Sequence, residues 1–230
     1  MTDPGNGPAA SQMGRRIILL VGPVGSGKGT QAEALAHQLG LVQLASGNLF
    51  RAALRDGTAL GEEARVYMER GDLVPDEITI AMFMEELAKP ASERGAILDG
   101  FPRTVAQAEA LDAILAGRGE RIERVISIEV PVEELIARVA GRRVCPVCGT
   151  PYHVTGDPPR VAGRCDHDGA ELVQRDDDRP EVVRARLAKQ VPPMLEVIDH
   201  YERAGIVLHV DGRQPIEAIT QEILAALGAD

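Results

Sequence analysis

The feature that most constrains this fold is a glycine-rich segment, Gly22–Thr30, which joins a predicted buried strand to a predicted helix. The strand covers Arg16–Val21, where the residues after the arginine form a continuous apolar run. The helix covers Thr30–Leu39, with its apolar residues on one face. Glycines at such a junction let the backbone wrap around a phosphate, and the positive end of the helix adds attraction. Lys28 would supply a full charge to the same anion.

The segment satisfies the Gly-x4-Gly-Lys part of the phosphate-loop pattern but departs from it at the next position. Gly29 follows Lys28 where Ser or Thr is expected, and Thr30 comes one residue late for the usual magnesium-ligand role. The alternative is a glycine-rich turn that binds no ligand. The flanking strand and helix favour a phosphate-binding loop.

The rest of the chain alternates between apolar runs and helical patterns, which predicts an α/β fold with a central parallel sheet flanked by helices. Further strands are predicted at Ala96–Leu98, Val125–Val130 and Ile206–Val210. Further helices are predicted at Ile78–Ala88, Val105–Leu115, Val132–Ala140, Arg179–Ala204 and Pro215–Leu227. The pair Pro192-Pro193 is expected to kink or divide the fourth of these helices.

Three stretches depart from this alternation. Residues 1–14 are rich in Gly, Pro, Ala and Asn and predict a mobile extension. Residues 45–74 carry short helical patterns and two polar turns, and residues 141–175 are rich in Gly, Pro and Cys. We interpret the latter two as inserts on a core domain formed by residues 15–44, 75–140 and 176–230.

Composition excludes several classes of protein. The net charge is −10, and aromatic residues make up only 3% of the chain, which argues against nucleic-acid binding. The apolar runs are far shorter than the ~20 residues that span a bilayer, and the N-terminus has no secretory pattern. Three cysteines cannot all pair, which favours a reducing, cytoplasmic setting. An acidic chain that binds a polyanion must concentrate its cations locally.

A second motif, Asp-Gly-Phe-Pro-Arg-Thr, begins at Asp99 directly after a predicted strand. The carboxyl ends of parallel strands form the ligand-binding edge of a sheet, so Asp99 is expected beside the phosphate loop, holding magnesium through water. The alternative for Asp99 is a helix cap or turn. Arg103 is placed to clamp a phosphate, against the alternative of an ordinary surface arginine.

The second insert contains a Cys-x2-Cys-x16-Cys-x2-Asp pattern formed by Cys145, Cys148, Cys165 and Asp168. Paired knuckles at this separation are typical of a tetrahedral structural zinc site. Asp168 stands at the fourth position, and the rival ligand His167 is displaced by one residue. Zinc would replace the apolar core that this insert cannot build. The alternative is three free thiols in a hydrogen-bonded insert.

The segments Gly22–Gln31 and Asp99–Thr104 together resemble the adenylate kinase family, and the resemblance runs from about Arg15 to the C-terminus. It implies reversible transfer of the terminal phosphoryl of Mg-ATP to AMP, giving two ADP. It also implies a P-loop kinase fold with a helical insert for the nucleoside monophosphate (NMP) at 45–74 and a mobile lid at 141–175. Gly29 is this family's own variant, and its long-lid members use three cysteines and one aspartate for zinc.

The resemblance also implies site residues. For ATP they are Gly25, Ser26, Gly27, Lys28, Gly29, Thr30, Arg138, Arg142, Pro151, Tyr152 and Gln214. For AMP they are Ser46, Arg51, Asp72, Leu73, Val74, Gly100, Phe101, Pro102, Arg103, Gln107, Arg175 and Arg186. The catalytic cations are Lys28, Arg103, Arg138, Arg142, Arg175 and Arg186. Catalysis by such a set is mostly positioning and charge stabilisation.

Two departures from the family bear on selectivity. Ser46 stands where Thr is usual and keeps the hydroxyl, whereas Asn48 stands where Asp is usual and removes a carboxylate near the phosphates. The close alternative is a kinase of GMP, UMP or CMP, against which Gln107 and the long lid favour AMP. A zinc-ribbon nucleic-acid-binding module and a regulatory nucleotide-binding protein without turnover are less consistent with the charge and the arginine set. We expect a monomer.

Overall fold

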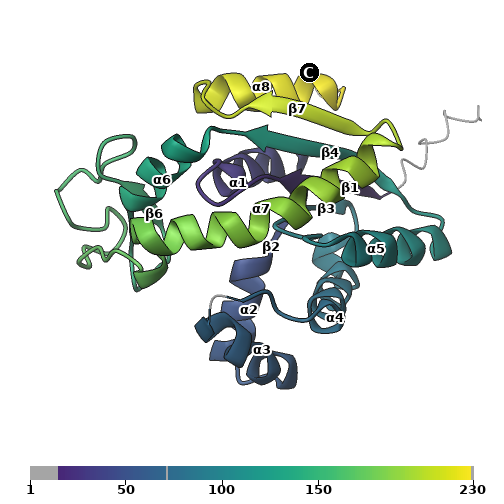
Figure 1. Cartoon of the computed structure of the whole chain (residues 1–230), viewed down its shortest axis with the longest axis horizontal. Coiled ribbons are helices and arrows are strands. Elements are labelled where there is room, and N and C mark those ends of the chain that lie inside the picture. The colour runs from purple at the N-terminus through teal and green to yellow at the C-terminus, as the bar shows by residue number, and fades with distance from the viewer. Residues whose placement is uncertain (1–14, 71, 229–230) are drawn as a thin grey trace, which may run out of the picture.

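The computed structural model describes residues 15–70 and 72–228. The predicted extension over residues 1–14 therefore lies outside the described residues. A five-stranded parallel sheet in the order β2-β3-β1-β4-β7 forms the centre (Figure 1). Its strands are β1 (Arg16–Val21), β2 (Val42–Ala45), β3 (Gly95–Asp99), β4 (Ile122–Glu129) and β7 (Val207–Asp211). The predicted α/β class is confirmed.

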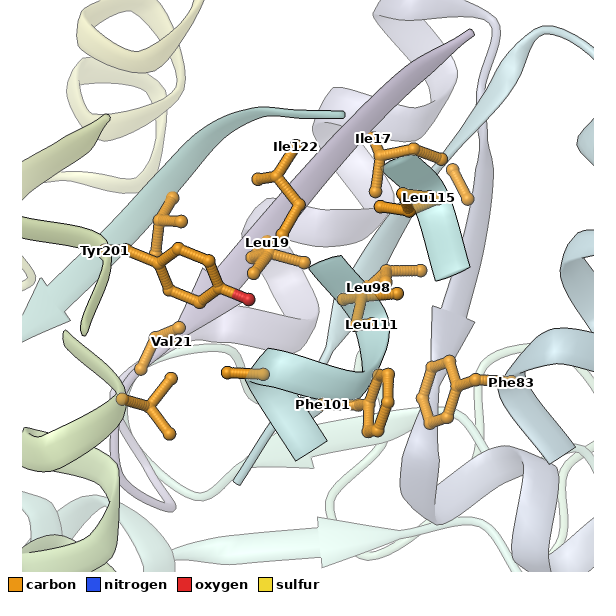
Figure 2. Close-up of a cluster of buried hydrophobic side chains, with 14 of the residues drawn as sticks. Ile17, Leu19, Val21, Phe83, Leu98, Phe101, Leu111, Leu115, Ile122 and Tyr201 are labelled. Atoms are coloured by element: carbon orange, nitrogen blue, oxygen red, sulfur yellow. The ribbon is translucent and has the colours of Figure 1, made fainter. Parts of the chain in front are cut away.

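The sheet is buried on both faces, which explains why β1 is continuously apolar. Ile17, Leu19 and Val21 point to one face, and Ile18 and Leu20 to the other. The first face is covered by α4 (Asp76–Leu87), α5 (Val105–Gly117) and α7 (Pro180–Glu202); the second by α1 (Lys28–Leu39) and α8 (Ile216–Ala226). Figure 2 shows the first face, where the rings of Phe83 and Phe101 stack at 4.2 Å between centroids.

The two predicted inserts project from this layered core at different places (Figure 1). Residues 45–74 include α2 (Ser46–Arg55) and α3 (Ala59–Arg70), which have an apolar cluster of their own with α4. Residues 141–175 follow α6 (Val132–Ala140) and form an antiparallel hairpin of β5 (Arg142–Val144) and β6 (Pro151–His153). One-turn helices occupy Pro90–Ser92 and Asp176–Asp178.

Two features of the core differ from the sequence prediction. The sequence did not predict β2, a four-residue strand in which Gln43 interrupts the apolar pattern, and which lies at the edge of the sheet. Of the two outcomes expected at Pro192-Pro193, a kink or a division of the helix, the division is wrong, because α7 continues through both prolines. Val191 packs against α6 just before the pair, and Met194 packs against the main core just after it. Packing on both sides offsets the cost of an interior proline, which is about 3 kcal/mol.

Within the described part of the chain, none of the helices combines the length and the apolar character that crossing a membrane demands.

Candidate active site

A cavity of about 730 Å³ opens at the carboxyl edge of the sheet, between the glycine loop, the two inserts and α7. It brings together most of the site residues that the sequence predicted, from segments far apart in the chain. Those that line it are Gly25, Ser26, Gly27, Lys28, Gly29, Thr30, Ser46, Arg51, Leu73, Asp99, Gly100, Pro102, Arg103, Arg138, Arg142, Pro151, Tyr152, Arg175, Arg186 and Gln214.

The loop that starts the cavity requires glycine for its shape. Gly25 has φ +85°, and a Cβ there would lie 2.7 Å from Val139 Cγ2 and 3.0 Å from the Leu135 carbonyl oxygen of α6. Gly27, with φ 95°, is the N-cap of α1, so the unpaired N–H groups of that helix face the cavity. The Ser26 hydroxyl is buried, and no described residue hydrogen-bonds to it. This loop therefore offers donors to an anion.

Lys28 and Asp99 lie together in a strongly cationic environment. The Lys28 ammonium donates to the Pro23 carbonyl at 2.8 Å. The pKa of Lys28 is lowered to about 8, chiefly by burial; Asp99 opposes this shift, and Arg103 and other arginines add to it. Burial raises the pKa of Asp99, although Lys28 and Arg103 act in the opposite direction. A Cβ on Gly29 would lie 3.7 Å from Asp99 Oδ2, which places this carboxylate beside the loop as predicted.

On the side of the first insert, two arginines are held by short polar contacts. Arg103 donates from Nε to the Gly100 carbonyl at 2.7 Å and from Nη2 to the Ser46 hydroxyl at 2.9 Å. Arg51 donates from Nη2 to Asn48 Oδ1 at 2.6 Å. Ser46 and Asn48, which depart from the family pattern, thus each accept a hydrogen bond from one of these guanidinium groups.

On the side of the second insert, the arginines have charged partners. Arg138 donates to the Gly212 carbonyl at 3.0 Å and to Glu134 at 2.6 Å. Arg142 makes a two-point contact with the fully buried carboxylate of Asp178, at 2.9 Å for Nε to Oδ2. Fixed in this way, both guanidinium groups face the cavity with little rotational freedom.

Four predicted AMP-binding residues do not line the cavity. Phe101 lies in the core against Phe83, and Val74 lies in the apolar cluster of the first insert. The Gln107 amide accepts from the Arg103 N–H at 2.7 Å and donates to Asp76 Oδ1 at 2.7 Å.

The fourth, Asp72, is exposed and accepts from the Lys189 ammonium of α7 at 3.3 Å. Of these four residues, Phe101 and Val74 support the site by packing.

The cavity also includes residues that the sequence prediction missed. Gln190 and Met194 lie on α7 four and eight residues after Arg186, so the three share one helix face. This helical spacing from Arg186 could have identified both residues from the sequence. His153 of β6 and Gln43 of β2 also line the cavity. Nothing in the local sequence marks them.

The second insert gathers Cys145, Cys148, Cys165 and Asp168, whose ligand atoms all lie within 4.8 Å of one another. Cys145 Sγ is 3.2 Å from Asp168 Oδ2, and Cys148 Sγ is 3.5 Å from Cys165 Sγ. Asp168, not His167, completes this group, as the spacing predicted. The Ala170 N–H lowers the pKa of Asp168 to about 2, which keeps the carboxylate ionised. A three-sulfur, one-oxygen set of this size fits a tetrahedral zinc ion.

Tyr152 joins this cluster to the cavity. Its ring is buried among Cys145, Cys165 and Leu172, yet the residue also lines the cavity. Its hydroxyl accepts from the Asp166 N–H at 2.8 Å and lies 3.5 Å from Cys165 Sγ. The cysteine cluster therefore holds Tyr152 in place, and with it this part of the cavity wall.

Comparison with known proteins adds an independent finding. Residues 20–206 match the family model described as adenylate kinase. A protein named adenylate kinase from Desulforamulus reducens is 46% identical over 210 residues, or 91% of this chain and 99% of the relative. One from Moorella thermoacetica is 47% identical over 213 residues, or 93% and 98%. One from Staphylococcus aureus is 43% identical over 210 residues, or 91% and 98%.

Proposed function

The chain belongs to the adenylate kinase family, and it transfers phosphate from ATP to AMP to give ADP; on this premise we propose how its cavity holds both nucleotides. The observation that carries the proposal is the single cavity shared by Lys28 and the five predicted catalytic arginines. Cations for two phosphate groups are needed together only where one group is transferred to the other.

The donor, ATP, lies along the glycine loop. The N–H groups of Gly25–Thr30 and the Lys28 ammonium hold its phosphates, helped by the positive end of α1. Arg138 and Arg142, from the end of α6 and the start of β5, hold the same phosphates. The base and ribose lie between the lid residues, Pro151-Tyr152, and the turn that contains Gln214.

The acceptor, AMP, lies against the first insert. Arg51 and Arg103 hold its phosphate, each oriented by the side-chain contact already described. Leu73 contributes apolar contact near the base, and Val74 supports it from the apolar cluster of the insert. Gln107 lies behind the cavity wall, where its amide accepts from the Arg103 N–H and donates to Asp76, and so it supports the segment that clamps AMP.

The positions of Ser46 and Gln107 bear on which acceptor base the cavity selects. The Ser46 hydroxyl is committed to Arg103, and Gln107 lies behind the cavity wall, so base selectivity rests on few direct contacts. GMP, UMP or CMP is therefore the alternative acceptor that the experiment must test.

Transfer itself needs positioning and charge, because the attacking group is already a phosphate oxygen. Arg175 and Arg186 line the same cavity and stabilise the charge on the group in transit. Asp99, beside Gly29 and Lys28, is the carboxylate that would hold Mg²⁺ through water. Bound there, the ion would neutralise charge on the donor phosphates. The lid, residues 141–175, and the NMP insert, residues 45–74, exclude water, which would otherwise accept the phosphoryl group.

The Cys145, Cys148, Cys165 and Asp168 group holds a structural Zn²⁺, because four protein donors leave no position open for substrate. A thiolate set of this kind fits a reducing compartment, and we place the chain in the cytoplasm as a monomer.

The test is a panel of AMP, GMP, CMP and UMP with Mg-ATP and purified protein, with nucleoside diphosphate formation measured by chromatography. We expect AMP to be used with a kcat/KM at least tenfold above the others. Comparable values for AMP and GMP would overturn the selectivity. Lys28→Met should abolish turnover, whereas Lys89→Met, an exposed lysine paired with Glu86 outside the cavity, should not change it.

A further inference from the structure

We propose that Gln31 is a positioning residue that fixes the β7–α8 turn against the phosphate loop and thereby sets the affinity for the base of ATP. The inference deepens the proposed function, because it concerns the donor end of the same cavity. Gln31 belongs to the glycine-loop motif in the sequence, yet no role in binding or transfer is assigned to it above.

The Gln31 side chain bridges two helices. It is the fourth residue of α1, and its exposed fraction is 2%. Its Nε2 donates to the Ile216 carbonyl at 3.0 Å, and its Oε1 accepts from the Thr220 hydroxyl at 2.8 Å. Both halves of the amide are therefore engaged with the first turn and a half of α8.

The surroundings of this bridge are apolar. Ala32 and Leu35 of α1 pack with Ile219 and Ile223 of α8 on the second face of the sheet. A buried amide in such a place is tolerated only when its polar atoms are satisfied. Hydrogen bonds in an apolar interface fix one register of the two helices, whereas apolar contacts alone allow sliding.

The residues that the bridge fixes belong to the cavity. Gln31, Ile216 and Ile219 all line it, as does Gln214 in the preceding turn. Gln31 is also only three residues after Lys28 on the same helix. One side chain thus sets the spacing between the groups that hold phosphates and those that meet the base.

The turn is held at its other end as well. Arg138 donates to the Gly212 carbonyl at 3.0 Å, and a Cβ at Gly212 would lie 2.6 Å from Val130 Cγ2. Gln214 lies between this fixed point and Ile216. Arg138 also belongs to the phosphate-binding set, so both ends of the turn are anchored to groups that hold the phosphates of ATP.

The bridge could instead serve stability alone. Loss of a purely structural contact lowers the free energy of unfolding but leaves the ratio of the two substrate KM values unchanged. Loss of a positioning contact raises KM for ATP selectively. The contrast between KM for ATP and KM for AMP therefore separates the two roles.

The experiment uses Gln31→Met, which keeps the length of the side chain, and Thr220→Val, which keeps its shape. Thr220 is absent from the cavity lining, so its effect must pass through Gln31 and the turn. The matched control is Thr79→Val, a buried threonine of α4 whose hydroxyl donates to the carbonyl of Pro75, the N-cap residue of that helix. Steady-state kinetics with varied ATP and varied AMP, calorimetric titration with ATP, and thermal melts are measured on the full chain.

We expect each bridge variant to raise KM and Kd for ATP about three- to tenfold, the size of one lost hydrogen bond. KM for AMP should change less than twofold. The double variant should raise KM for ATP no more than the stronger single variant does, because both substitutions break the same hydrogen-bonded bridge. Both bridge variants should also show a lower selectivity for ATP over GTP as the phosphate donor.

A folded Gln31→Met with unchanged affinity for ATP would overturn the proposal, as would equal increases in both KM values. If Gln31→Met fails to fold, Thr220→Val gives the same two readouts. Absence of turnover in the unsubstituted chain would refute the proposed function instead, and calorimetry with ATP would still decide the role of Gln31.

Discussion

Replacing Gly25 with alanine should destabilise the chain in two separable ways. The backbone there has φ +85°, which costs an L-residue about 1–2 kcal/mol. The new methyl group would also lie 2.7 Å from Val139 Cγ2 and 3.0 Å from the Leu135 carbonyl. Overpacking of this kind costs about 1–3 kcal/mol, because α6 must move or Val139 must leave its rotamer. The total expected loss is about 2–5 kcal/mol.

Gly27 provides a matched control two residues later. Its φ is +95°, but a Cβ there has nothing within 4 Å, so Gly27→Ala should show only the backbone cost of about 1–2 kcal/mol. Gly117, at the end of α5, has neither a positive φ nor a neighbour and serves as the reference substitution. The difference between Gly25→Ala and Gly27→Ala isolates the contact with α6.

The assay is urea unfolding followed by circular dichroism, without nucleotide, with the free energy taken from the midpoint and slope. We expect Gly25→Ala to lie about 1–3 kcal/mol below Gly27→Ala. Equal losses for the two variants would show that α6 does not press on the loop, and would refute the packing described for it.

Three further predictions concern charge and metal. Lys28 is the cation that we propose to hold phosphate, and its pKa is lowered to about 8, chiefly by burial, so kcat/KM for ATP should fall as pH rises through 8. Lys28→Arg should remove this fall, and a flat profile to pH ~9.5 in the unsubstituted chain would contradict the prediction. Arg142→Met leaves the buried Asp178 carboxylate without this partner and should cost about 3–5 kcal/mol in urea unfolding. Arg138→Met removes a half-buried pair with Glu134 and one hydrogen bond to the Gly212 carbonyl, and should cost about 1–2 kcal/mol, so a loss equal to that of Arg142→Met would refute the burial argument. Elemental analysis should find about one zinc per chain, and chelation should lower the melting temperature; metal-free protein with an unchanged melt would favour the hydrogen-bonded lid.

The sequence predicted the core because both faces of the sheet are buried. A strand such as β1 then has a continuous apolar run, which is followed by Gly22, and the neighbouring strand β3 ends in Asp99 at the same edge. The edge strand β2 was missed because it is short and half-buried, with Gln43 in the middle. Hydrophobic pattern alone does not distinguish such a strand from a loop.

The site was predicted where chemistry depends on local spacing. The glycine loop and the Cys-x2-Cys-x16-Cys-x2-Asp pattern each have a fixed geometry, and the structure groups Asp168, as the spacing predicted, with the three cysteines. Local spacing does not predict contacts between segments that are distant in the sequence. Asp178, one of three consecutive aspartates, pairs with Arg142 across 36 residues, and nothing local distinguishes it from its neighbours.

A motif also mixes binding residues with supporting ones. Phe101 stands between Gly100 and Pro102, both of which line the cavity, but its own ring is in the core against Phe83. Sequence spacing places a residue near a site, but the direction of its side chain depends on the packing around it. Arg186, Gln190 and Met194 show the opposite behaviour. Their spacing of four residues places them on one helix face, and all three line the cavity, although only Arg186 was predicted.

The central claim is that one cavity holds two nucleotides and transfers phosphate between them. The most direct test follows ADP and Mg²⁺ alone with the purified chain by ³¹P NMR. The account predicts that ATP and AMP appear in equal amounts, with no inorganic phosphate, and that Lys28→Met forms neither. Release of inorganic phosphate without AMP, or ADP that stays unchanged, would contradict it.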